Sequence, residues 1–402
     1  MKIAMINSVC YGSTGRICRD NMRALKAAGR GARLFYGRGA GPKDGDTVRF
    51  SGMADVYAHV LLARLTDGQG FCASRRATGR LIELLDGYQP DVIHLHQPHG
   101  YYLHLPTLFR YLKGCARPVV WSLHDCWTVT GHCAYFTAAG CERWREDCGR
   151  CPQKSAYPAA WIDRSAQNLL KKRALFCGVP NLTLVTPSAW LKSVVERSAL
   201  SKYPVQVIPN GVDRTVFCPP SEESGQSAGP RRGENGALIL GAANVWEPRK
   251  GLDVFFALRK LLPESMRILL VGLSKAQIRA LPPGIEGRER TANARELAAL
   301  YRMADVFVNP SSEDNYPTTH LEALCCGTPV VTFDVGGCRE ALTDACGIAV
   351  PFGDTAALAR AVQRALLLQR ADCLARAEAF GCEQTAAAHL ALYESVLHGE
   401  RR

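Results

Sequence analysis

The stretch NPSSEDNYPTTHLEALCCGTPVV, residues 309–331, contains the pattern that decides the fold. The apolar run DVFVNP (305–310) leads into it, and a second run, TPVVTF (328–333), ends it. Between these runs lie a polar loop and a segment with helical spacing, which begins near Pro317 and ends before Gly327. Short runs that are apolar on both faces and alternate with helices are typical of parallel strands covered by helices. The stretch is therefore predicted to be one βαβ unit.

The same alternation extends along the rest of the chain. Other apolar runs have the length of strands and are separated by segments with helical spacing. The strand-like runs are 2–7, 32–37, 91–96, 118–124, 182–187, 205–210, 237–243 and 267–272, and helical spacing is clearest over 16–28, 77–85 and 190–198. This order predicts an α/β fold built from parallel sheets.

The chain of 402 residues is too long for one hydrophobic core to be the default. Residues 218–236 are rich in Pro, Gly, Ser and charge, which is typical of a linker or an exposed loop. We expect two doubly wound, Rossmann-like domains that face a cleft. The expected boundaries are 1–215 for the N-terminal domain, 216–236 for the linker, 237–385 for the second domain, and 386–402 for a C-terminal helix that packs back on the first domain.

The composition favours a cytoplasmic globular protein with an anionic partner. Hydrophobic residues make up 47% and charged residues 21% of the chain, and no run of eighteen apolar residues suggests a transmembrane helix. The first residues read as a strand and a glycine turn, unlike a signal peptide. The net charge of +12 suits nucleic acid, a lipid leaflet or a phosphorylated substrate. No nucleic-acid-binding motif is present, so we expect no nucleic acid partner.

The loop and helix start within 309–331 have the chemistry of a diphosphate site. Backbone N–H groups at a helix N-terminus, together with the hydroxyls of Thr318 and Thr319, suit phosphate and sugar oxygens. Asp314 and Glu322 are eight residues apart, which places them about two helical turns from each other. The alternative is a structural crossover whose acids are merely exposed.

Two further loops follow predicted strands. GAANVWEPRKGLDVF (241–255) places Arg249 and Lys250 at a helix start, where cations suit a departing nucleoside diphosphate. CYGSTGRI (10–17) is a glycine turn after the first strand, a weaker signal because many βα turns contain glycine. A solvated basic helix start and an ordinary turn are the alternatives.

Histidines gather at two predicted strand ends. His124 ends the run PVVWSLH, and HLHQPHGYYLH (94–104) contains four more histidines. His94 and His96 share one face of a strand, so they could form a metal pair or contact acceptor sugars. A lone histidine is also common in a protein core.

Seventeen cysteines are unusual for a cytoplasmic protein, and disulfides are not expected there. GHCAYFTAAGCERWREDCGRCPQ (131–153) has four of them and ends in C-x2-C. Four thiolates could close a tetrahedral, structural zinc site that fixes a long loop. The alternative is a set of free thiols. The zinc hypothesis concerns Cys133, Cys141, Cys148 and Cys151.

Taken together, these motifs resemble the donor-binding region of retaining glycosyltransferases of family 4, which have the two-domain GT-B fold. Residues 309–331 resemble the E-x7-E motif of that family, with Asp314 where the first Glu usually stands and Glu313 as the alternative. The resemblance implies that Glu322 holds the nucleotide ribose. It assigns the diphosphate to Lys250 and Arg249, while Asn244 replaces the usual arginine after the strand.

The resemblance also implies roles for the remaining candidates. His124 is expected under the donor sugar and, with Arg249, Lys250 and Asp314, forms the catalytic set. The expected donor-binding residues are Gly12, Ser13, Thr14, Gly15, Asn244, Glu313, Asn315, Tyr316, Pro317, Thr318, Thr319 and Glu322. Acceptor contacts are expected from His96, His99 and Asp125.

The implied reaction is metal-independent transfer of a hexose from a UDP- or GDP-sugar, with retention. Cysteine-bearing loops like 131–153 occur in similar exopolysaccharide transferases of the colanic acid type. The expected acceptor is a saccharide, lipid-linked, in exopolysaccharide or lipopolysaccharide synthesis. Two alternatives are a sugar-nucleotide epimerase of the same fold and a non-catalytic scaffold of a polysaccharide assembly complex.

A basic stripe suggests a peripheral position on the inner face of the membrane. Five cations recur every three or four residues in the first predicted helix, so they could rest on anionic headgroups. A solvated helix face would look the same. The stripe consists of Arg16, Arg19, Arg23, Lys26 and Arg30.

Overall fold

The computed structural model describes residues 1–42, 44–219 and 236–399. The chain divides into two compact units. Unit 1 comprises Met1–Pro209 and Thr385–Arg402, and unit 2 comprises Asn210–Gln384. Most of the segment predicted as a linker, residues 220–235 of 216–236, lies outside the described residues.

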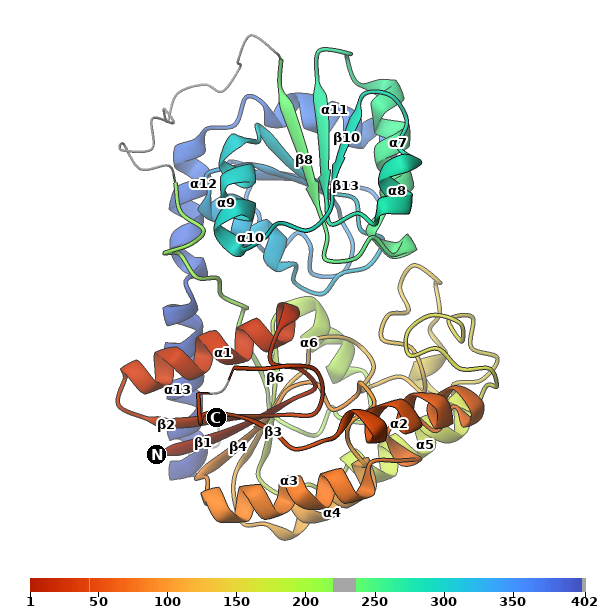
Figure 1. Cartoon of the computed structure of the whole chain (residues 1–402), viewed down its shortest axis with the longest axis vertical. Helices are drawn as coiled ribbons and strands as arrows, with labels where there is room; N and C mark the ends of the chain where they lie inside the picture. The colour runs from red at the N-terminus through yellow and green to blue at the C-terminus, as the bar shows by residue number, and fades with distance from the viewer. Residues whose placement is uncertain (43, 220–235, 400–402) are drawn as a thin grey trace. The chain divides into compact units, whose positions relative to one another are not determined.

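Unit 1 is a seven-stranded parallel sheet with helices on both faces (Figure 1). The strand order is β3-β2-β1-β4-β5-β6-β7. The strands are β1 Lys2–Asn7, β2 Gly31–Tyr36, β3 Thr47–Arg49, β4 Val92–Leu95, β5 Val119–Ser122, β6 Leu182–Thr186 and β7 Val205–Val207. The helices are α1 Gly12–Ala27, α2 Met53–Thr66, α3 Arg75–Tyr88, α4 Leu105–Gly114, α5 Ser165–Phe176, α6 Ala189–Glu196 and α13 Cys382–His398, with 3-10 turns η1 Gln69–Phe71 and η2 Arg143–Arg145.

Alternate residues of the strands fill two separate cores, as expected for a sheet that is buried on both faces. Along β1, Ala4 and Ile6 join the core that contains Trp121. Ile3 and Met5 point to the other face, where Tyr393 of the C-terminal helix α13 closes the second core. The last helix of the chain is therefore an integral part of unit 1.

Unit 2 is a six-stranded parallel sheet in the order β10-β9-β8-β11-β12-β13. The strands are β8 Leu238–Ala242, β9 Arg267–Val271, β10 Ile285–Arg288, β11 Val306–Asn309, β12 Val330–Phe333 and β13 Gly347–Val350. The helices are α7 Leu252–Leu261, α8 Lys275–Arg279, α9 Ala294–Met303, α10 Thr318–Cys325, α11 Thr355–Ala365 and α12 Arg370–Ala377, with 3-10 turns η4 Pro248–Lys250 and η5 Glu378–Phe380. Residues 309–331 form the end of β11, a loop, α10 and the start of β12, so the predicted βαβ unit is confirmed.

The predicted α/β class with two doubly wound parallel sheets is confirmed. Three strands, β3, β10 and β13, were not predicted, and each lies at the edge of its sheet. An edge strand is only half covered, so its residues need not form a continuous apolar run. Only the first residue of the β10 sequence IEGR, for example, is buried.

The strand order of each sheet reverses at one point. The chain builds β1, β2 and β3 outward and then returns to place β4 beside β1, and it does the same with β8 and β11 in unit 2. Loops at the carboxyl ends of the two strands that flank such a reversal diverge and leave room for a ligand. A ligand site is therefore expected at these two positions.

Candidate functional site

The loops after β8 and β11 meet in unit 2 through an ion pair. Lys250, at the end of η4, donates a hydrogen bond from Nζ to Oδ2 of Asp314 over 2.6 Å. Beside it, the guanidinium of Arg249 donates to the backbone carbonyl of Glu313 over 3.3 Å. The backbone N–H of Ser312 donates to the carbonyl of Arg249 over 2.8 Å. The structure thus brings together both predicted cations and the predicted acid, although Lys250 and Asp314 are 64 residues apart in the chain.

The electrostatics of this pair keep the acid ionised. Burial alone would raise the pKa of Asp314, but the charge and hydrogen bond of Lys250, aided by Arg249, outweigh it and lower that pKa. The side chains of Lys250 and Asp314 are 21% and 13% exposed, so solvent screens the pair only weakly. The second cation, Arg249, also pairs with Glu247 over 3.1 Å, so an anionic ligand would meet two cations that each have a carboxylate partner.

A second loop, after β12, holds the backbone of Asp314 from the other side. The N–H of Gly337 donates to the carbonyl of Asp314 over 3.2 Å. Gly336 has a φ of 56°, and a Cβ there would lie 1.9 Å from that carbonyl oxygen. Only glycine fits, because both the backbone angle and the close approach exclude a side chain. This pair of glycines was not predicted, although the string VGG (335–337) after an apolar strand is a signal for it.

Helix α10 carries the rest of the predicted donor set. Thr318 and Thr319 form its first turn and are partly exposed, whereas Asn315, Tyr316 and Pro317 in the preceding loop are buried. Glu322 is buried about one turn into α10, and the phenol of Tyr301 donates to its Oε2 over 3.1 Å. Tyr301, on α9, is a positioning residue that sequence analysis missed.

His320 is another residue of α10 that sequence analysis did not select. Its Nε2 lies 2.8 Å from Nδ2 of Asn309, and its Nδ1 lies 3.2 Å from the carbonyl of Cys338. Burial lowers the pKa of His320 to about 4, so the ring is neutral at physiological pH. The histidine thus ties α10 to the loop after β12.

Asn244, which stands where an arginine was expected, lies exposed in the loop after β8. A different cation lies next to it, because Arg290 donates from Nη2 to the carbonyl of Asn244 over 3.5 Å. Arg290 follows the edge strand β10, which sequence analysis missed, and this explains why the residue was not considered.

In unit 1 the reversal point between β1 and β4 is also lined by polar side chains. The hydroxyls of Ser8 and Thr14 donate to Oε1 of Gln97 over 3.0 and 3.4 Å. The glycine turn leads directly into α1, and Gly12 and Ser13 are exposed at its first turn. A Cβ at Gly15 would lie 2.5 Å from the carbonyl carbon of Cys10, so glycine there allows close contact between the helix and the loop.

The predicted acceptor residues gather at the ends of β4 and β5. Nδ1 of His96 lies 3.1 Å from Nε2 of His124, and the two rings are stacked. Burial lowers the pKa of His124 to about 4, although Asp125 opposes the shift. Asp125 lies 2.9 Å from Nε2 of His99, whose Nδ1 lies 3.1 Å from the hydroxyl of Tyr157. His96 with His124 and His99 with Asp125 therefore form two polar pairs, which are joined through the adjacent residues 124 and 125.

The possible metal pair of His94 and His96 is not formed. Nδ1 of His94 lies 2.6 Å from the hydroxyl of Tyr393, and its Nε2 lies 2.8 Å from Oγ of Ser122. Both nitrogens are thus occupied, so His94 is a core histidine with satisfied hydrogen bonds.

The four cysteines proposed to bind zinc line one small pocket together with aromatic side chains. The N–H of Gly131 donates to the sulfur of Cys148 over 3.3 Å. A hydrogen bond from Cys133 lowers the pKa of Cys151 to about 7, against the effect of burial. Among the residues that the structure describes, however, no three His, Cys, Asp or Glu side chains form a group that could hold a metal ion. The zinc site stays a prediction.

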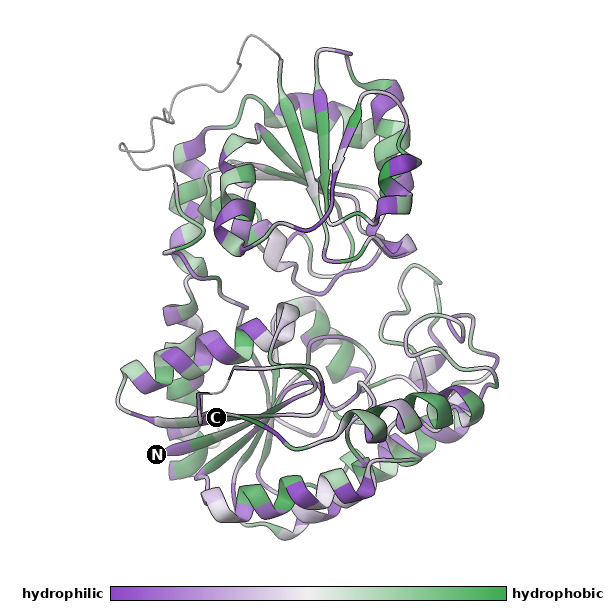
Figure 2. Cartoon of the chain, in the orientation of Figure 1, coloured by the Kyte–Doolittle hydropathy of each residue, from purple (hydrophilic) through white to green (hydrophobic). Residues whose placement is uncertain are grey.

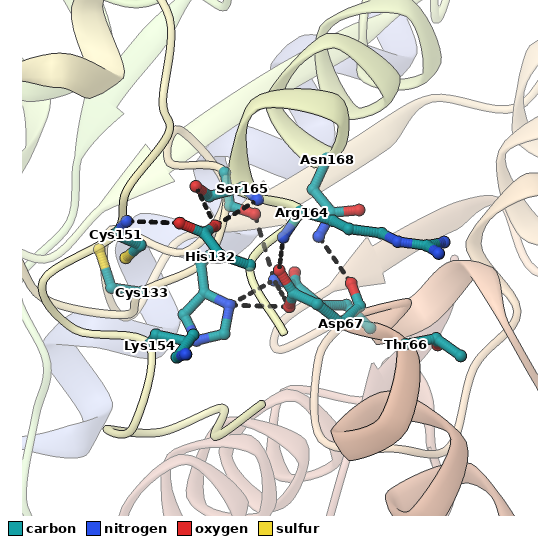
Figure 3. A network of polar contacts seen from close by, with 12 residues as sticks. Thr66, Asp67, His132, Cys133, Cys151, Lys154, Arg164, Ser165 and Asn168 are labelled. Carbon is teal, nitrogen blue, oxygen red and sulfur yellow. Dashed lines mark hydrogen bonds and ion pairs between the residues drawn. The ribbon is translucent and has the colours of Figure 1, made fainter. Parts of the chain in front are cut away.

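Figure 3 shows how the cysteine loop, residues 131–153, is joined to its surroundings. His132 bonds through Nδ1 to Oδ1 of the buried Asp67 over 2.8 Å. The same aspartate accepts the backbone N–H of Arg164 over 2.9 Å, and Asn168 donates to its carbonyl over 2.7 Å. Asp67 directly follows α2, so the end of α2, the cysteine loop and the start of α5 form one polar network.

The basic stripe on α1 is partly neutralised. Arg23 pairs with Asp20 over 3.0 Å, Lys26 pairs with Asp46, and Arg30 pairs with Glu394 over 2.9 Å. These internal partners weaken its attraction for an anionic surface. Within the described part of the chain, no helix has the length and apolar content to cross a membrane.

Comparison with known proteins gives consistent results for both units. A family model described as Glycosyltransferase Family 4 matches residues 14–216, and one described as Glycosyl transferases group 1 matches residues 236–367. The chain is 26% identical over 350 residues to the glycosyl transferase WcaC of Escherichia coli (strain K12), assigned to colanic acid biosynthesis, and the match covers 82% of each protein.

Two solved structures have a similar fold. Sucrose-phosphate synthase from Thermosynechococcus elongatus superposes with a TM-score of 0.72 at 19% identity, covering 99% of this chain and 100% of that one. HepE from Anabaena, solved in complex with UDP, gives a TM-score of 0.67 at 14% identity, covering 98% of this chain and 100% of that one.

Proposed function

The chain belongs to glycosyltransferase family 4, and from this premise we propose that it transfers a hexose from a nucleotide-sugar to a saccharide acceptor with retention. The observation that carries this proposal is the pair of Lys250 and Asp314, joined over 2.6 Å where the strand order of unit 2 reverses. Two cations next to the first turn of α10 have the chemistry to bind a diphosphate.

In the proposed reaction, the bond between the anomeric carbon and the diphosphate oxygen breaks, and the nucleoside diphosphate leaves with the electron pair. Lys250 and Arg249 offset the negative charge that develops on it. This would make the reaction metal-independent. The acceptor hydroxyl forms the new bond on the same face of the sugar, and its proton passes to the departing diphosphate. The products are the glycoside and the free nucleoside diphosphate.

The other residues are assigned positioning roles. Before the donor binds, Asp314 holds the Lys250 ammonium in place, and its carboxylate can then accept hydrogen bonds from donor-sugar hydroxyls. Glu322, fixed by Tyr301, is assigned to the ribose. His124 is neutral at physiological pH because its pKa is lowered, so it offers the sugar a hydrogen bond without adding positive charge.

The relatives guide the choice of pathway and donor. The similarity to WcaC supports a role in exopolysaccharide or lipopolysaccharide synthesis, with a lipid-linked acceptor at the inner face of the cytoplasmic membrane. The UDP in the HepE structure makes UDP-sugars the first donors to test, followed by GDP-sugars.

The test is release of free nucleoside diphosphate from a panel of UDP- and GDP-sugars, with and without a membrane lipid extract. We expect release from one donor, stimulated by the extract, and NMR of the product should show the anomeric configuration of the donor. Interconversion of the sugar without acceptor would indicate the epimerase alternative. A folded protein that processes no donor would support the scaffold alternative.

A further inference from the structure

The carboxyl edge of the unit 1 sheet gathers polar groups to which the proposed reaction assigns no particular ligand. The loops after β1, β2 and β4 end there, where the strand order reverses. Ser8 joins these three loops, because its carbonyl accepts the N–H of Arg38 over 3.0 Å and its hydroxyl donates to Gln97 over 3.0 Å. Helix α1 begins at the same edge, and Figure 2 shows hydrophilic and hydrophobic segments alternating along it, as expected for a helix with one face on the sheet.

Three side chains at this edge, Asp125, His99 and Tyr157, form a chain of hydrogen bonds that we call the Tyr157 relay. Asp125 accepts the backbone N–H of Trp127 over 2.9 Å, and its other oxygen lies 2.9 Å from Nε2 of His99. Nδ1 of His99 lies 3.1 Å from the hydroxyl of Tyr157. Burial alone would raise the pKa of Asp125, but the contacts with His99 and Trp127 outweigh it and lower that pKa, so the carboxylate is ionised at neutral pH.

The ionised carboxylate decides which nitrogen of His99 carries the proton. A carboxylate only accepts hydrogen bonds, so Nε2 of His99 must donate to Asp125. The amide nitrogen of Gln97 lies 3.3 Å from the same Nε2, but it is a donor and does not compete for that proton. In the neutral ring Nδ1 is then an acceptor, so the hydroxyl of Tyr157 donates to it. The phenol oxygen keeps its lone pairs and can accept a hydrogen bond from a ligand hydroxyl.

The backbone beside the relay is held in a strained conformation. Tyr101 has a φ of 66°, which is rare for a bulky residue and persists where the surrounding structure enforces it. A Cβ on the preceding Gly100 would lie 3.1 Å from Cβ of Ser8 and 3.7 Å from the hydroxyl of Tyr157, so this turn brings Tyr157 to the end of β1. Tyr157 is 40% exposed, and its ring meets that of Tyr101 edge to face at 6.1 Å. An exposed ring whose hydroxyl is fixed in place suits the apolar C–H face of a sugar.

Arg38 adds a cation to the same edge. Burial raises the pKa of Tyr157 against the charge of Arg38, and it raises that of Tyr101 against the charges of Arg64 and Arg38, so the guanidinium of Arg38 lies near both rings. The Arg38 side chain is partly exposed and, within the part of the chain that the structure describes, has no ion-pair partner. A guanidinium without a carboxylate partner is suited to bind a carboxylate or a phosphate through two parallel N–H donors.

We propose that Arg38 and Tyr157 form a subsite for the acceptor, and that this subsite selects a saccharide with an anionic group, either a carboxylate or a phosphate. The phenol oxygen accepts a sugar hydroxyl, the exposed ring contacts the C–H face, and Arg38 binds the anionic group. Asp125 and His99 are positioning residues, because they act on the sugar through Tyr157. Since the strand reversal of unit 2 is assigned to the donor, the acceptor role of this subsite rests on the proposed function.

The experiment is titration of the full chain, without donor, with methyl glucuronide, glucose 6-phosphate, methyl glucoside and inorganic phosphate, followed by saturation-transfer and phosphorus NMR. We expect one of the two anionic sugars to bind at least about tenfold more tightly than methyl glucoside, and the sugar that binds identifies the anionic group. Arg38→Gln should weaken binding of that sugar at least about tenfold and abolish its preference over methyl glucoside. A purely structural role of Arg38 would leave this preference in place.

Tyr157→Phe keeps the ring but removes the phenol oxygen. It should weaken the binding of anionic and neutral sugars by the same factor and leave the preference unchanged. Tyr57→Phe and Arg80→Gln are matched controls, because they alter an exposed tyrosine of α2 and an exposed arginine of α3, and both should bind like the unmodified chain. Thermal unfolding verifies that each variant is folded.

NMR of the chain labelled with ¹⁵N-histidine tests the positioning residues separately. His99 should appear as the tautomer protonated at Nε2, and Asp125→Asn should shift the proton toward Nδ1, because an amide can donate to Nε2. A proton on Nδ1 of His99 in the unmodified chain would refute the relay.

Four titration results would overturn the subsite. They are no binding of either anionic sugar, equal binding of methyl glucoside, an unchanged preference in Arg38→Gln, and binding of inorganic phosphate as tight as that of glucose 6-phosphate. Nucleoside diphosphate release without any sugar binding would reject the subsite alone. Sugar binding that depends on Arg38, without release from any donor, would reject the transfer reaction and support the saccharide subsite.

Discussion

The substitution Lys250→Ala tests the centre of the proposed site. In the transition state the leaving diphosphate gains negative charge, and removal of one preorganised donor at such a position typically lowers the rate about 10²- to 10³-fold. This corresponds to roughly 3–4 kcal/mol of lost stabilisation. We expect a decrease of this size in kcat/KM.

The effect on folding should be smaller. Lys250→Ala leaves Asp314, 13% exposed, without its closest cation, although Arg249 remains nearby. The expected loss is about 1–3 kcal/mol in the free energy of unfolding. Because the folded pKa of Asp314 is lowered, the pair stabilises the fold above the unfolded pKa of about 3.9 and loses that contribution only as the pH falls further. At neutral pH the pair is therefore fully formed in the unmodified chain.

The assay is nucleoside diphosphate release at low donor concentration, with thermal unfolding measured in parallel. Arg267→Ala is the matched control, because Arg267 pairs with Glu286 over the same 2.6 Å in unit 2 but on the surface. Exposed pairs contribute only about 0–1 kcal/mol, so this variant should keep its activity. A Lys250→Ala protein with activity close to that of the unmodified chain would refute the assignment of the diphosphate to this cluster.

Three further predictions concern other parts of the molecule. Gly336→Ala should lower the free energy of unfolding by about 1–3 kcal/mol and weaken donor binding, measured by titration calorimetry. Gly353 also has a positive φ, but an added Cβ there would meet no atom within 4 Å, so Gly353→Ala should leave donor binding unchanged. Burial lowers the pKa of His389 to about 4, so between about pH 6.5 and pH 4 this histidine binds a proton in the unfolded chain but not in the folded one. The free energy of unfolding should therefore decrease as the pH is lowered through this range. In denaturation experiments, His389→Leu should reduce the slope of that free energy against pH by about one proton. In chelator-treated protein, alkylation of Cys151 by iodoacetamide should reach half its maximal rate near pH 7. Elemental analysis of untreated protein should give one zinc per chain, and a metal-free result would refute the zinc hypothesis.

Much of the fold could be predicted because most interior strands are covered on both faces. A strand that is covered on both faces, such as the one in DVFVNP, is a nearly continuous apolar run. This pattern can be recognised without knowing which strands lie beside it in the sheet. Three of the four edge strands, β3, β10 and β13, lack it, and the cation Arg290 was missed together with the strand β10 that it follows. The glycines at 336 and 337 were missed for another reason, since their role depends on the carbonyl of Asp314, more than twenty residues earlier in the chain.

Contacts within the site were only partly predictable for the same reason. The sequence suggested that Lys250 and Asp314 would serve the same ligand, but their direct contact follows from the reversal of strand order between β8 and β11. In unit 1 the equivalent reversal brings Gln97 to Ser8 and Thr14. Local patterns indicate which residues end strands, whereas strand order decides which of those ends become neighbours.

The direction in which an amphipathic helix faces is the least predictable feature of this chain. The basic stripe of α1 reads as a membrane contact in sequence, yet three of its cations have acidic partners within unit 1. On α2, Leu61 and Leu65 are exposed, while Val56, His59 and Ala63 are buried and His59 bonds to Ser74 and Gln69. Periodicity predicts that a helix has an apolar stripe, but it does not predict which face of the helix packs against the protein. The packed face depends on which side chains find hydrogen-bond partners in the rest of the fold.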